Sequence, residues 1–346
     1  MRVVRFGGRS GTAVVEPLRA RREDRRAVVR VTHASVGATD AMAVSGDYLL
    51  HPFAGFVPGY DFVGIVERLP AEPRAELSIG QRVAGVLPGM GAHATIVRAA
   101  PSLLVPVPAD LDDLVAATAP LDAVTARLAL DALGLDGAGS RRSGLDGRRR
   151  DARARGRRDG SVLVQGAGGA VGAWAVQLAR RRGLEVFGTA SGRSSAHATS
   201  LGARVLDYRE RDWPERLLLA SGGGVSGAVD HTGGREPRRV VRPSGRIVRI
   251  AFGGEPGARR SAAARGALTA IGRGAAHPAE RVCSTPAVVA LRRAAYRGAL
   301  AETLESMSVG ELAAPRPRTF ALDEYGDALA FAEAAAPGEK AVLVMP

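Results

Sequence analysis

The sequence predicts an α/β protein in which a β-rich first part precedes a part that alternates strands and helices. Three observations predict this class. Short β-branched segments separated by Gly, Pro or charged residues occupy the chain up to residue 108. The stretch Ser161–Ala173, SVLVQGAGGAVGA, passes from an apolar run through a glycine cluster into a helical pattern. Strand and helix patterns then alternate as far as residue 254, which is typical of a parallel sheet.

The composition is that of a globular protein. The chain has 346 residues, of which 46% are hydrophobic, enough for two domains with sizeable cores. No apolar run approaches the ~20 residues that span a membrane, and the N-terminus lacks the apolar segment of a secretory signal. A single cysteine, Cys283, excludes an internal disulfide and a cysteine-based zinc site. We therefore expect a cytoplasmic protein without membrane contact.

The formal net charge of +13 comes largely from arginine. Basic charge favours polyanions, including phosphorylated cofactors and nucleic acids. The alternative is ordinary solvated surface charge, which we favour over nucleic-acid binding. Residues 137–160 are rich in Gly and Arg and almost without apolar side chains, so we expect an exposed loop there.

The first part of the chain is predicted to be a small barrel, because its strands are short and its turn signals closely spaced. A loop with a short helical turn, residues 37–48, interrupts it. The strands are expected in residues 2–6, 11–17, 25–36, 62–69, 79–86 and 91–108.

From residue 111 the periodicity becomes helical, with one or two helices up to residue 133. After the glycine cluster, strands are expected at 183–190, 204–208, 225–234 and 246–254. The helices between them are expected at 194–203, 213–222 and 236–245. Residues 285–310 are predicted to be helical, and the tail 318–346 to form a strand, a helix and a strand. The Ala/Gly/Arg-rich segment 253–282 supports no detailed assignment.

The glycine cluster indicates a dinucleotide-binding βαβ unit. Its glycines allow a tight turn and let the backbone approach a pyrophosphate at the positive N-terminus of the next helix. The residues expected to bind the cofactor here are Gly166, Gly168, Gly169, Ala170, Val171 and Gly172.

The loop after the second strand of this unit predicts which dinucleotide binds. NAD enzymes place an acidic residue there, about 20 residues after the glycines, to bind the ribose 2′-hydroxyl. Residues 189–193, TASGR, contain no acid. Ser191 can donate a hydrogen bond, and Arg193 can pair with a 2′-phosphate. We therefore predict NADPH as cofactor, although Arg193 is alternatively an ordinary surface arginine.

Several ordered segments resemble the medium-chain dehydrogenase/reductase superfamily, and within it the zinc-free branch of quinone oxidoreductase-like proteins and enoyl reductases. The resemblance covers nearly the whole chain. The segments are VRVTHASVGATDAMAVSGDY, VPGYDFVGIVE, IGQRVAG, VLVQGAGGAVGAWAVQLAR, VDHTGG followed by PSGRIVRI, and GEKAVLV.

The resemblance implies a GroES-like β-barrel catalytic domain into which a Rossmann cofactor domain is inserted. The catalytic domain would comprise residues 1–122 and 300–346, and the Rossmann NADPH-binding domain residues 123–299. Residues 137–160 would then be a basic insertion. It either contacts a partner or is a tolerated surface loop, which we favour.

Further cofactor contacts follow from the resemblance. Tyr208 matches a tyrosine that lines the adenosine phosphate site, and Lys340 matches the lysine of the family's terminal Gly-Lys-x-Val strand. Thr232 lies where the family backbone contacts the nicotinamide side, after Asp230, which is expected to be structural. The family's usual lysine in the loop after Ser191 is missing.

The resemblance also implies that no metal is bound. Zinc-dependent relatives carry a cysteine near the position of Gly37 and a His-Glu pair after Gly59, where this chain has Tyr60 and Asp61. His33, His51 and His93 show no ligand spacing. Without a metal, alcohol oxidation loses its usual Lewis acid.

What remains is conjugate reduction, in which hydride is added to the β-carbon of an enone or quinone. Tyr48 matches an active-site tyrosine whose hydroxyl would bind the carbonyl or donate a proton; alternatively it packs the cleft wall. Asp40 matches a family aspartate that acts in catalysis or fixes the loop. Tyr60 and Asp61 are expected to hold the barrel. Gly37 replaces a frequent asparagine, which removes a donor and is expected to open space.

The leading hypothesis is an NADPH-dependent, zinc-independent reductase of α,β-unsaturated carbonyls or quinones. One alternative is a biosynthetic reductive cyclase acting on a conjugated polyene-carbonyl compound. Another is a non-catalytic NADPH-binding regulator whose Arg-rich loop engages nucleic acid or an acidic partner. The resemblance also implies a homodimer that pairs the strand near Arg246–Phe252. The sequence does not identify the substrate.

Overall fold

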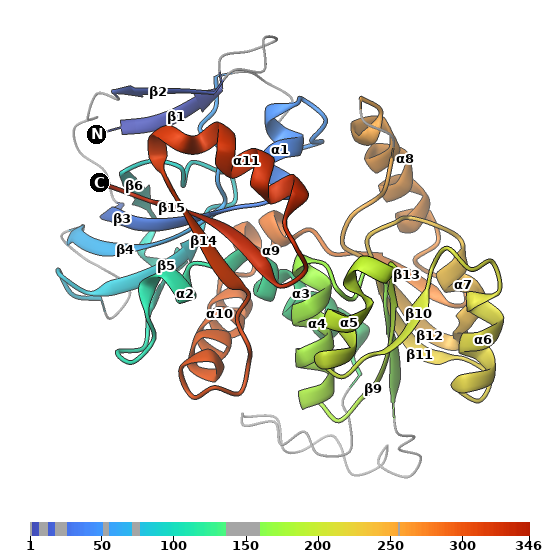
Figure 1. Cartoon of the computed structure of the whole chain (residues 1–346). Coiled ribbons are helices and arrows are strands. Elements are labelled where there is room, and N and C mark those ends of the chain that lie inside the picture. Colours follow the sequence, from blue (N-terminus) through green and yellow to red (C-terminus); the bar gives the residue numbers. More distant parts are fainter. Residues whose placement is uncertain are drawn as a thin grey trace. The chain divides into compact units, whose positions relative to one another are not determined.

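The computed structural model describes residues 2–6, 13–17, 26–50, 55–70, 77–135, 160–254 and 257–346 (Figure 1). The basic segment 137–160 lies outside this range except for Gly160. By its contacts the chain divides into two units. Unit 1 comprises Met1–Leu128, Gly254–Ala264 and Ser284–Pro346, and unit 2 comprises Ala129–Gly253 and Arg265–Cys283.

Unit 1 is built on β-sheets, as the short β-branched segments predict. Strands β1 and β2 form an antiparallel pair, and a second sheet has the order β14-β15-β3-β4-β5-β7, with β6 also paired to β3. In the described part of this sheet, only the pair β14–β15 is parallel. The strand bounds are β1 Arg2–Phe6, β2 Ala13–Pro17, β3 Ala27–Val36, β4 Asp61–Arg68, β5 Arg82–Val86, β6 Ile96–Ala99, β7 Leu104–Pro106, β14 Arg316–Ala321 and β15 Glu339–Val344.

The helices of unit 1 confirm the helical patterns after residue 110 and in the tail. The bounds are α1 Ala38–Val44, α2 Asp113–Ala116, α9 Thr285–Leu291, α10 Arg293–Ser308 and α11 Tyr325–Ala334, with α3 Pro120–Leu133 beginning in this unit and the 3₁₀ turns at Pro101–Leu103 and Leu322–Glu324.

Helix α10 is tied to the sheet of unit 1 by a buried tyrosine. The Tyr296 hydroxyl accepts a hydrogen bond from the Val86 amide and donates one to the Leu103 carbonyl, both at 2.8 Å. Burial raises the pKa of Tyr296, so the hydroxyl keeps the proton that it donates. By these contacts residues 284–299, which the sequence-based bounds assign to the Rossmann domain, lie with unit 1.

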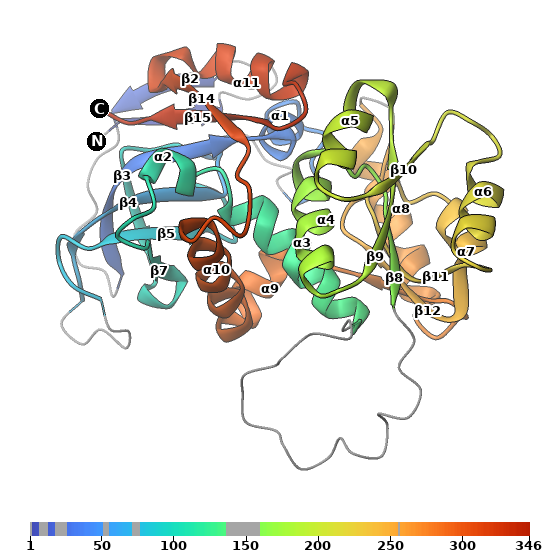
Figure 2. The ribbon, with the colours of Figure 1, turned by 60° about the horizontal axis from the view of Figure 1, so that its bottom comes forward.

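Unit 2 contains a parallel sheet of the order β10-β9-β8-β11-β12-β13, which confirms the predicted alternation. Its strands are β8 Ser161–Val164, β9 Glu185–Ala190, β10 Arg204–Asp207, β11 Val225–Asp230, β12 Val241–Arg249 and β13 Ala279–Val282. Its helices are α4 Ala170–Arg181, α5 Gly192–Ser200, α6 Trp213–Ala220 and α7 Glu236–Val240, while α8 Arg259–Gly272 begins in unit 1 and ends in unit 2. Figure 2 shows α4 and α6 on opposite sides of these strands.

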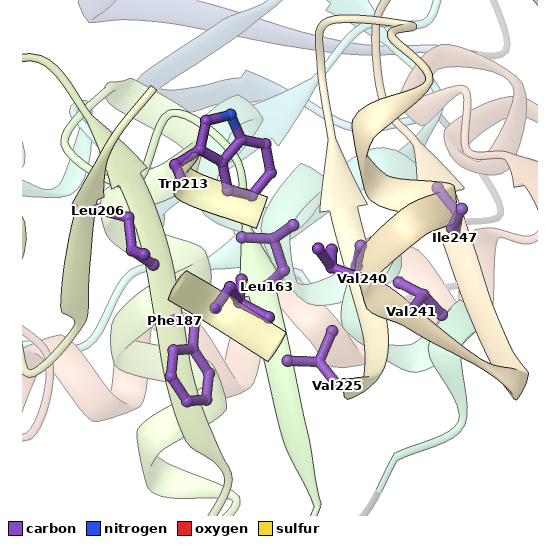
Figure 3. Close-up of a cluster of buried hydrophobic side chains, with 10 residues drawn as sticks. Leu163, Phe187, Leu206, Trp213, Val225, Val240, Val241 and Ile247 are labelled. Atoms are coloured by element: carbon purple, nitrogen blue, oxygen red, sulfur yellow. The ribbon is translucent and has the colours of Figure 1, made fainter. Parts of the chain in front are cut away.

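Apolar side chains on one face of the parallel sheet pack against α6 and α7 (Figure 3). Trp213 and Leu217 of α6 and Val240 of α7 cover strand residues such as Leu163 and Phe187. Burying one large apolar side chain contributes about 1.5–3 kcal/mol. This cluster therefore holds β8, which precedes the glycine turn, in the centre of the sheet.

Two sequence-based expectations about unit 2 are wrong. The helix expected at 236–245 ends at Val240, because Pro243 cannot donate a helical hydrogen bond and disfavours a helical conformation of the residue before it. The strand near Arg246–Phe252 is not an edge, since β12 pairs with β11 on one side and with β13 on the other. A second subunit therefore cannot pair with β12, and homodimer formation stays a prediction.

No helix among the described residues is long and apolar enough to span a membrane.

Candidate functional site

The strand order of unit 2 reverses direction between β8 and β11, whose carboxyl ends lie side by side. In open parallel sheets, ligands bind beyond the carboxyl ends of strands at such a reversal. The glycine turn follows β8, and the segment His231–Gly234 follows β11. The Gln165 backbone amide donates to the Val229 carbonyl at 3.0 Å, and its side-chain oxygen lies 3.1 Å from the Thr232 hydroxyl oxygen. The fold therefore joins two of the predicted cofactor segments.

The glycine turn is packed too tightly for side chains. Gly166 has a φ of +66°, which favours glycine. A Cβ atom on Gly172 would lie 2.0 Å from the Gly166 carbonyl oxygen, and one on Gly168 would lie 2.6 Å from the Ser194 Cβ. The turn thus lies directly on the first turns of α4 and α5, as a backbone cradle for a pyrophosphate requires.

Helix α4 begins immediately after this turn. Its N-cap is Gly169, which has no side chain to accept hydrogen bonds from the first-turn N–H groups. These groups belong to the predicted residues Ala170, Val171 and Gly172, and they stand at the positive end of the helix dipole. The residues present therefore fit the phosphate groups of a dinucleotide.

The residues predicted to recognise the adenosine half follow the neighbouring strands β9 and β10. Ser191 is the N-cap of α5, and its hydroxyl oxygen lies 3.5 Å from that of Ser194. Arg193 is exposed in the first turn of the same helix. Tyr208 follows β10, is 52% exposed, and has the Arg209 guanidinium 5.9 Å from its ring centroid. Because β8, β9 and β10 are parallel, all three residues lie beyond the carboxyl ends of the strands, as the glycine turn does.

Asp230 anchors the segment after β11. It is fully buried, and its carboxylate accepts hydrogen bonds from the Thr232 hydroxyl at 2.7 Å and from the Gly233 amide at 2.8 Å. The Thr232 amide donates to it as well, at 3.2 Å. Asp230 therefore acts as the strand-end structural residue that the sequence suggested, and it orients Thr232.

In unit 1, Asp40 links the start of α1 to the turn before β4. Its two carboxylate oxygens accept hydrogen bonds from the Gly37 amide at 2.9 Å and from the Gly59 amide at 3.0 Å. The side chain is buried. Of the two roles considered for Asp40, this geometry supports fixing of the loop.

Tyr48 lies against a second tyrosine. The Tyr60 hydroxyl donates a hydrogen bond to the Tyr48 hydroxyl at 3.1 Å, and the rings meet edge to face with centroids 6.3 Å apart. Burial raises the pKa of Tyr48, the bond from Tyr60 lowers it, and Asp40 raises it, so that the net shift is upward. Tyr48 thus stays protonated at neutral pH. No sequence pattern indicates this pair, because it depends on how α1 and β4 are placed.

Lys340 is buried in unit 1 beside carboxylates. Its ammonium donates to Asp122 at 2.6 Å, and a Cβ atom on Gly37 would lie 3.2 Å from it. Burial alone would lower the pKa of Lys340, but Asp122, Asp61 and Asp40 raise it above its ordinary value. The ammonium group of Lys340 therefore borders the place where a side chain at residue 37 would begin, and the opening of space at Gly37 stays a prediction.

Asp61 belongs to the same cluster. It is buried and accepts hydrogen bonds from the Ser35 hydroxyl at 2.7 Å and from the Leu121 amide at 2.9 Å. Burial raises its pKa to about 7, against the lowering effect of Lys340. Its contacts hold the sheet to the start of α3.

Within the described ranges, no group of three or more His, Cys, Asp or Glu side chains is arranged to hold a metal ion. The ring nitrogen Nε2 of His93 lies 2.9 Å from the Ser35 carbonyl oxygen. Zinc independence stays a prediction.

Comparison with known proteins places this geometry in a family. Residues 23–109 match the model described as the alcohol dehydrogenase GroES-like domain, and residues 170–300 match that described as zinc-binding dehydrogenase. A trans-enoyl reductase of Penicillium crustosum is 31% identical over 59% of this chain and 55% of its own length. A quinone oxidoreductase of Sus scrofa is 28% identical over 64% of this chain and 62% of its own length.

The chain therefore spans less than two thirds of the length of these two relatives. Among solved structures, the JamJ enoyl reductase in its apo form superposes with a TM-score of 0.80 at 19% identity, covering 100% of this chain and 99% of that one. This likeness shows the fold. With its GroES-like and nucleotide-binding parts matched in order, the chain belongs to the medium-chain dehydrogenase/reductase superfamily, whose dinucleotide-binding domain implies an NAD(P) cofactor.

Proposed function

We propose that this protein is an NADPH-dependent, zinc-independent reductase that adds hydride to the β-carbon of an α,β-unsaturated carbonyl compound or a quinone. The observation that supports it most is the pairing of the glycine turn with the Thr232 segment at the strand reversal of unit 2. The names of the relatives, trans-enoyl reductase and quinone oxidoreductase, agree with this chemistry.

In this proposal unit 2 binds the cofactor beyond the carboxyl ends of its parallel strands. The backbone of Gly166–Gly172 and the start of α4 hold the pyrophosphate, and Ser191, Arg193 and Tyr208 recognise the adenosine half with its 2′-phosphate. Thr232 serves the nicotinamide half. Lys340, which the resemblance assigns to the cofactor, belongs to unit 1, where its buried ammonium donates to Asp122. The bound cofactor supplies the hydride.

Tyr48 supplies the protein's part of the chemistry. As the carbon–carbon double bond is reduced, negative charge develops on the carbonyl oxygen. The Tyr48 hydroxyl accepts a hydrogen bond from Tyr60 and keeps its own proton, which it donates to that oxygen or to the α-carbon. Asp40 and Tyr60 are positioning residues for this group.

Neither alternative gains support. The reductive cyclase rested on open space at Gly37, which the ammonium of Lys340 borders. The nucleic-acid or acidic-partner role rested on residues 137–160, which lie outside the described residues apart from Gly160.

The proposal is tested by assaying the purified protein with NADPH or NADH against alkyl enones, trans-2-enoyl thioesters and quinones. We expect oxidation of NADPH with at least one class, and a KM about tenfold lower for NADPH than for NADH. Preincubation with a zinc chelator should leave the rate unchanged. The reductase activity would be contradicted by lack of turnover with all substrates. Comparable KM values for NADPH and NADH would contradict the cofactor preference, and inactivation by the chelator would contradict zinc independence.

Replacement of Tyr48 by phenylalanine should lower kcat by about a hundredfold, since one positioned proton donor typically contributes that much. The Kd for NADPH should not change, because the proposed contact of Tyr48 is with the substrate and not with the cofactor. Tyr60→Phe serves as the matched control, since it removes the hydrogen bond but leaves the Tyr48 hydroxyl, and should lower kcat less. A Tyr48→Phe enzyme with wild-type kcat would mean that Tyr48 only packs the wall.

A further inference from the structure

Unit 2 contains a buried charged network that the proposed function does not use. Arg249 of β12 is 1% exposed, Asp230 of β11 is 0% exposed, and Glu280 of β13 is 1% exposed. The Arg249 guanidinium donates to Asp230 at 2.5 Å and to Glu280 at 3.2 Å. One side chain therefore connects three adjacent strands.

Two further arginines bind the Glu280 end of the network. Arg238 and Arg273 both donate to the Glu280 carboxylate, the second at 3.0 Å. Burial raises the pKa of Glu280, but these arginines together with Arg249 lower it overall. All the charged partners are thus matched, as burial of charge requires.

Sheet stability alone does not explain Arg249. Apolar residues flank it in the sequence RIVRIAF, which begins in β12 and continues past its end. A buried ion network is often no more stable than well-packed apolar side chains of similar volume. What an apolar residue at this position would lose is control over the segment after β11.

Arg249 controls this segment at both of its ends. It donates directly to the Gly234 carbonyl at 3.0 Å, and it binds the Asp230 carboxylate that accepts hydrogen bonds from Thr232 and Gly233. The single proton of the Thr232 hydroxyl is shared between Asp230, at 2.7 Å, and the side-chain oxygen of Gln165, at 3.1 Å, at the start of the glycine turn. A continuous series of polar contacts thus runs from β13 to the glycine turn.

We propose that Arg249 is a positioning residue that presents Thr232–Gly234 to the nicotinamide half of the cofactor. This inference rests on the proposed function. The segment follows β11, on one side of β8, whereas Ser191 and Arg193 follow β9, on the other side. The two halves of the cofactor are therefore held by separate groups, and Arg249 affects only one of them.

The test compares NADPH with adenosine 2′,5′-bisphosphate, which is the adenosine half alone, by titration calorimetry. Arg249→Lys keeps the charge but cannot reach Asp230, Glu280 and Gly234 together. It should raise the Kd for NADPH about tenfold and leave the Kd for the bisphosphate within about twofold. Arg193→Ala is the matched control and should weaken both ligands about equally.

Thr232→Val provides a second variant in case Arg249→Lys does not fold, because it removes the relaying hydroxyl and leaves the ion network intact. It should show the same selective loss of NADPH affinity. Equal loss of both ligands, or no loss of either, in a folded variant would overturn the inference. A wild-type protein that binds neither ligand would refute the proposed function itself, and the inference with it.

Discussion

Replacement of Gly172 by alanine is expected to raise the Kd for NADPH by at least about a hundredfold, the equivalent of roughly 2.7 kcal/mol. The added Cβ would lie 2.0 Å from the Gly166 carbonyl oxygen, 2.8 Å from its carbonyl carbon and 3.0 Å from the Ala167 Cα. All three are backbone atoms of the turn, so they cannot rotate away as the end of a side chain can. The turn must open, which removes the pyrophosphate cradle.

Gly272→Ala is the matched control for this experiment. Gly272 ends α8 and does not have the left-handed φ, and a Cβ added to it would have no neighbouring atom within 4 Å, so alanine fits there. The NADPH affinity and melting temperature of this variant should equal those of the wild type. A Gly172→Ala protein with unaltered affinity would show that the cofactor binds elsewhere.

The second large effect concerns the dependence of stability on pH. The pKa of Asp61 is raised from 3.8 to about 7 in the folded protein, chiefly by burial. Because the pKa of Asp61 is higher in the folded than in the unfolded protein, protonated Asp61 stabilises the fold. This contribution is fully present below the unfolded pKa of 3.8 and is lost as the pH rises through the folded pKa of about 7. The difference between the two pKa values corresponds to about 4 kcal/mol.

Asp61→Asn should remove this dependence, because the amide does not ionise. We therefore compare the free energy of unfolding of Asp61→Asn with that of the wild type at each pH. The value for the variant minus the value for the wild type should rise by up to about 4 kcal/mol between about pH 4 and about pH 8. Urea denaturation across this range measures it. Glu280 and the other carboxylates are present in both proteins and cancel in the comparison.

Asp110→Asn, at an exposed turn, is the control and should follow the wild-type profile. A constant difference between Asp61→Asn and the wild type over the whole range would contradict the raised pKa. It would leave Asp61 as a hydrogen-bond acceptor for Ser35 and Leu121 only.

The order of strands and helices in both units could be predicted from local patterns alone. Apolar periodicity, β-branched runs and the glycines between β8 and α4 are features of neighbouring residues, and they fix the local backbone conformation. The alternation after residue 160 was therefore sufficient to predict a parallel sheet. It failed at β13, because its four residues, Ala279–Val282, carry no strand signal within an Ala/Gly/Arg-rich segment.

Local patterns could not predict which side chains meet around Lys340 in unit 1 and around Arg249 in unit 2. Lys340 and Asp122 are 218 residues apart, and Arg249 meets Asp230 and Glu280 only because β12 lies between β11 and β13. Such pairs depend on strand order and on burial, where a charge must find its partner however distant in the chain. The glycine motif thus revealed a cofactor turn from its own residues, whereas the ammonium beside Gly37 and the arginine behind Thr232 became visible only when the chain was folded.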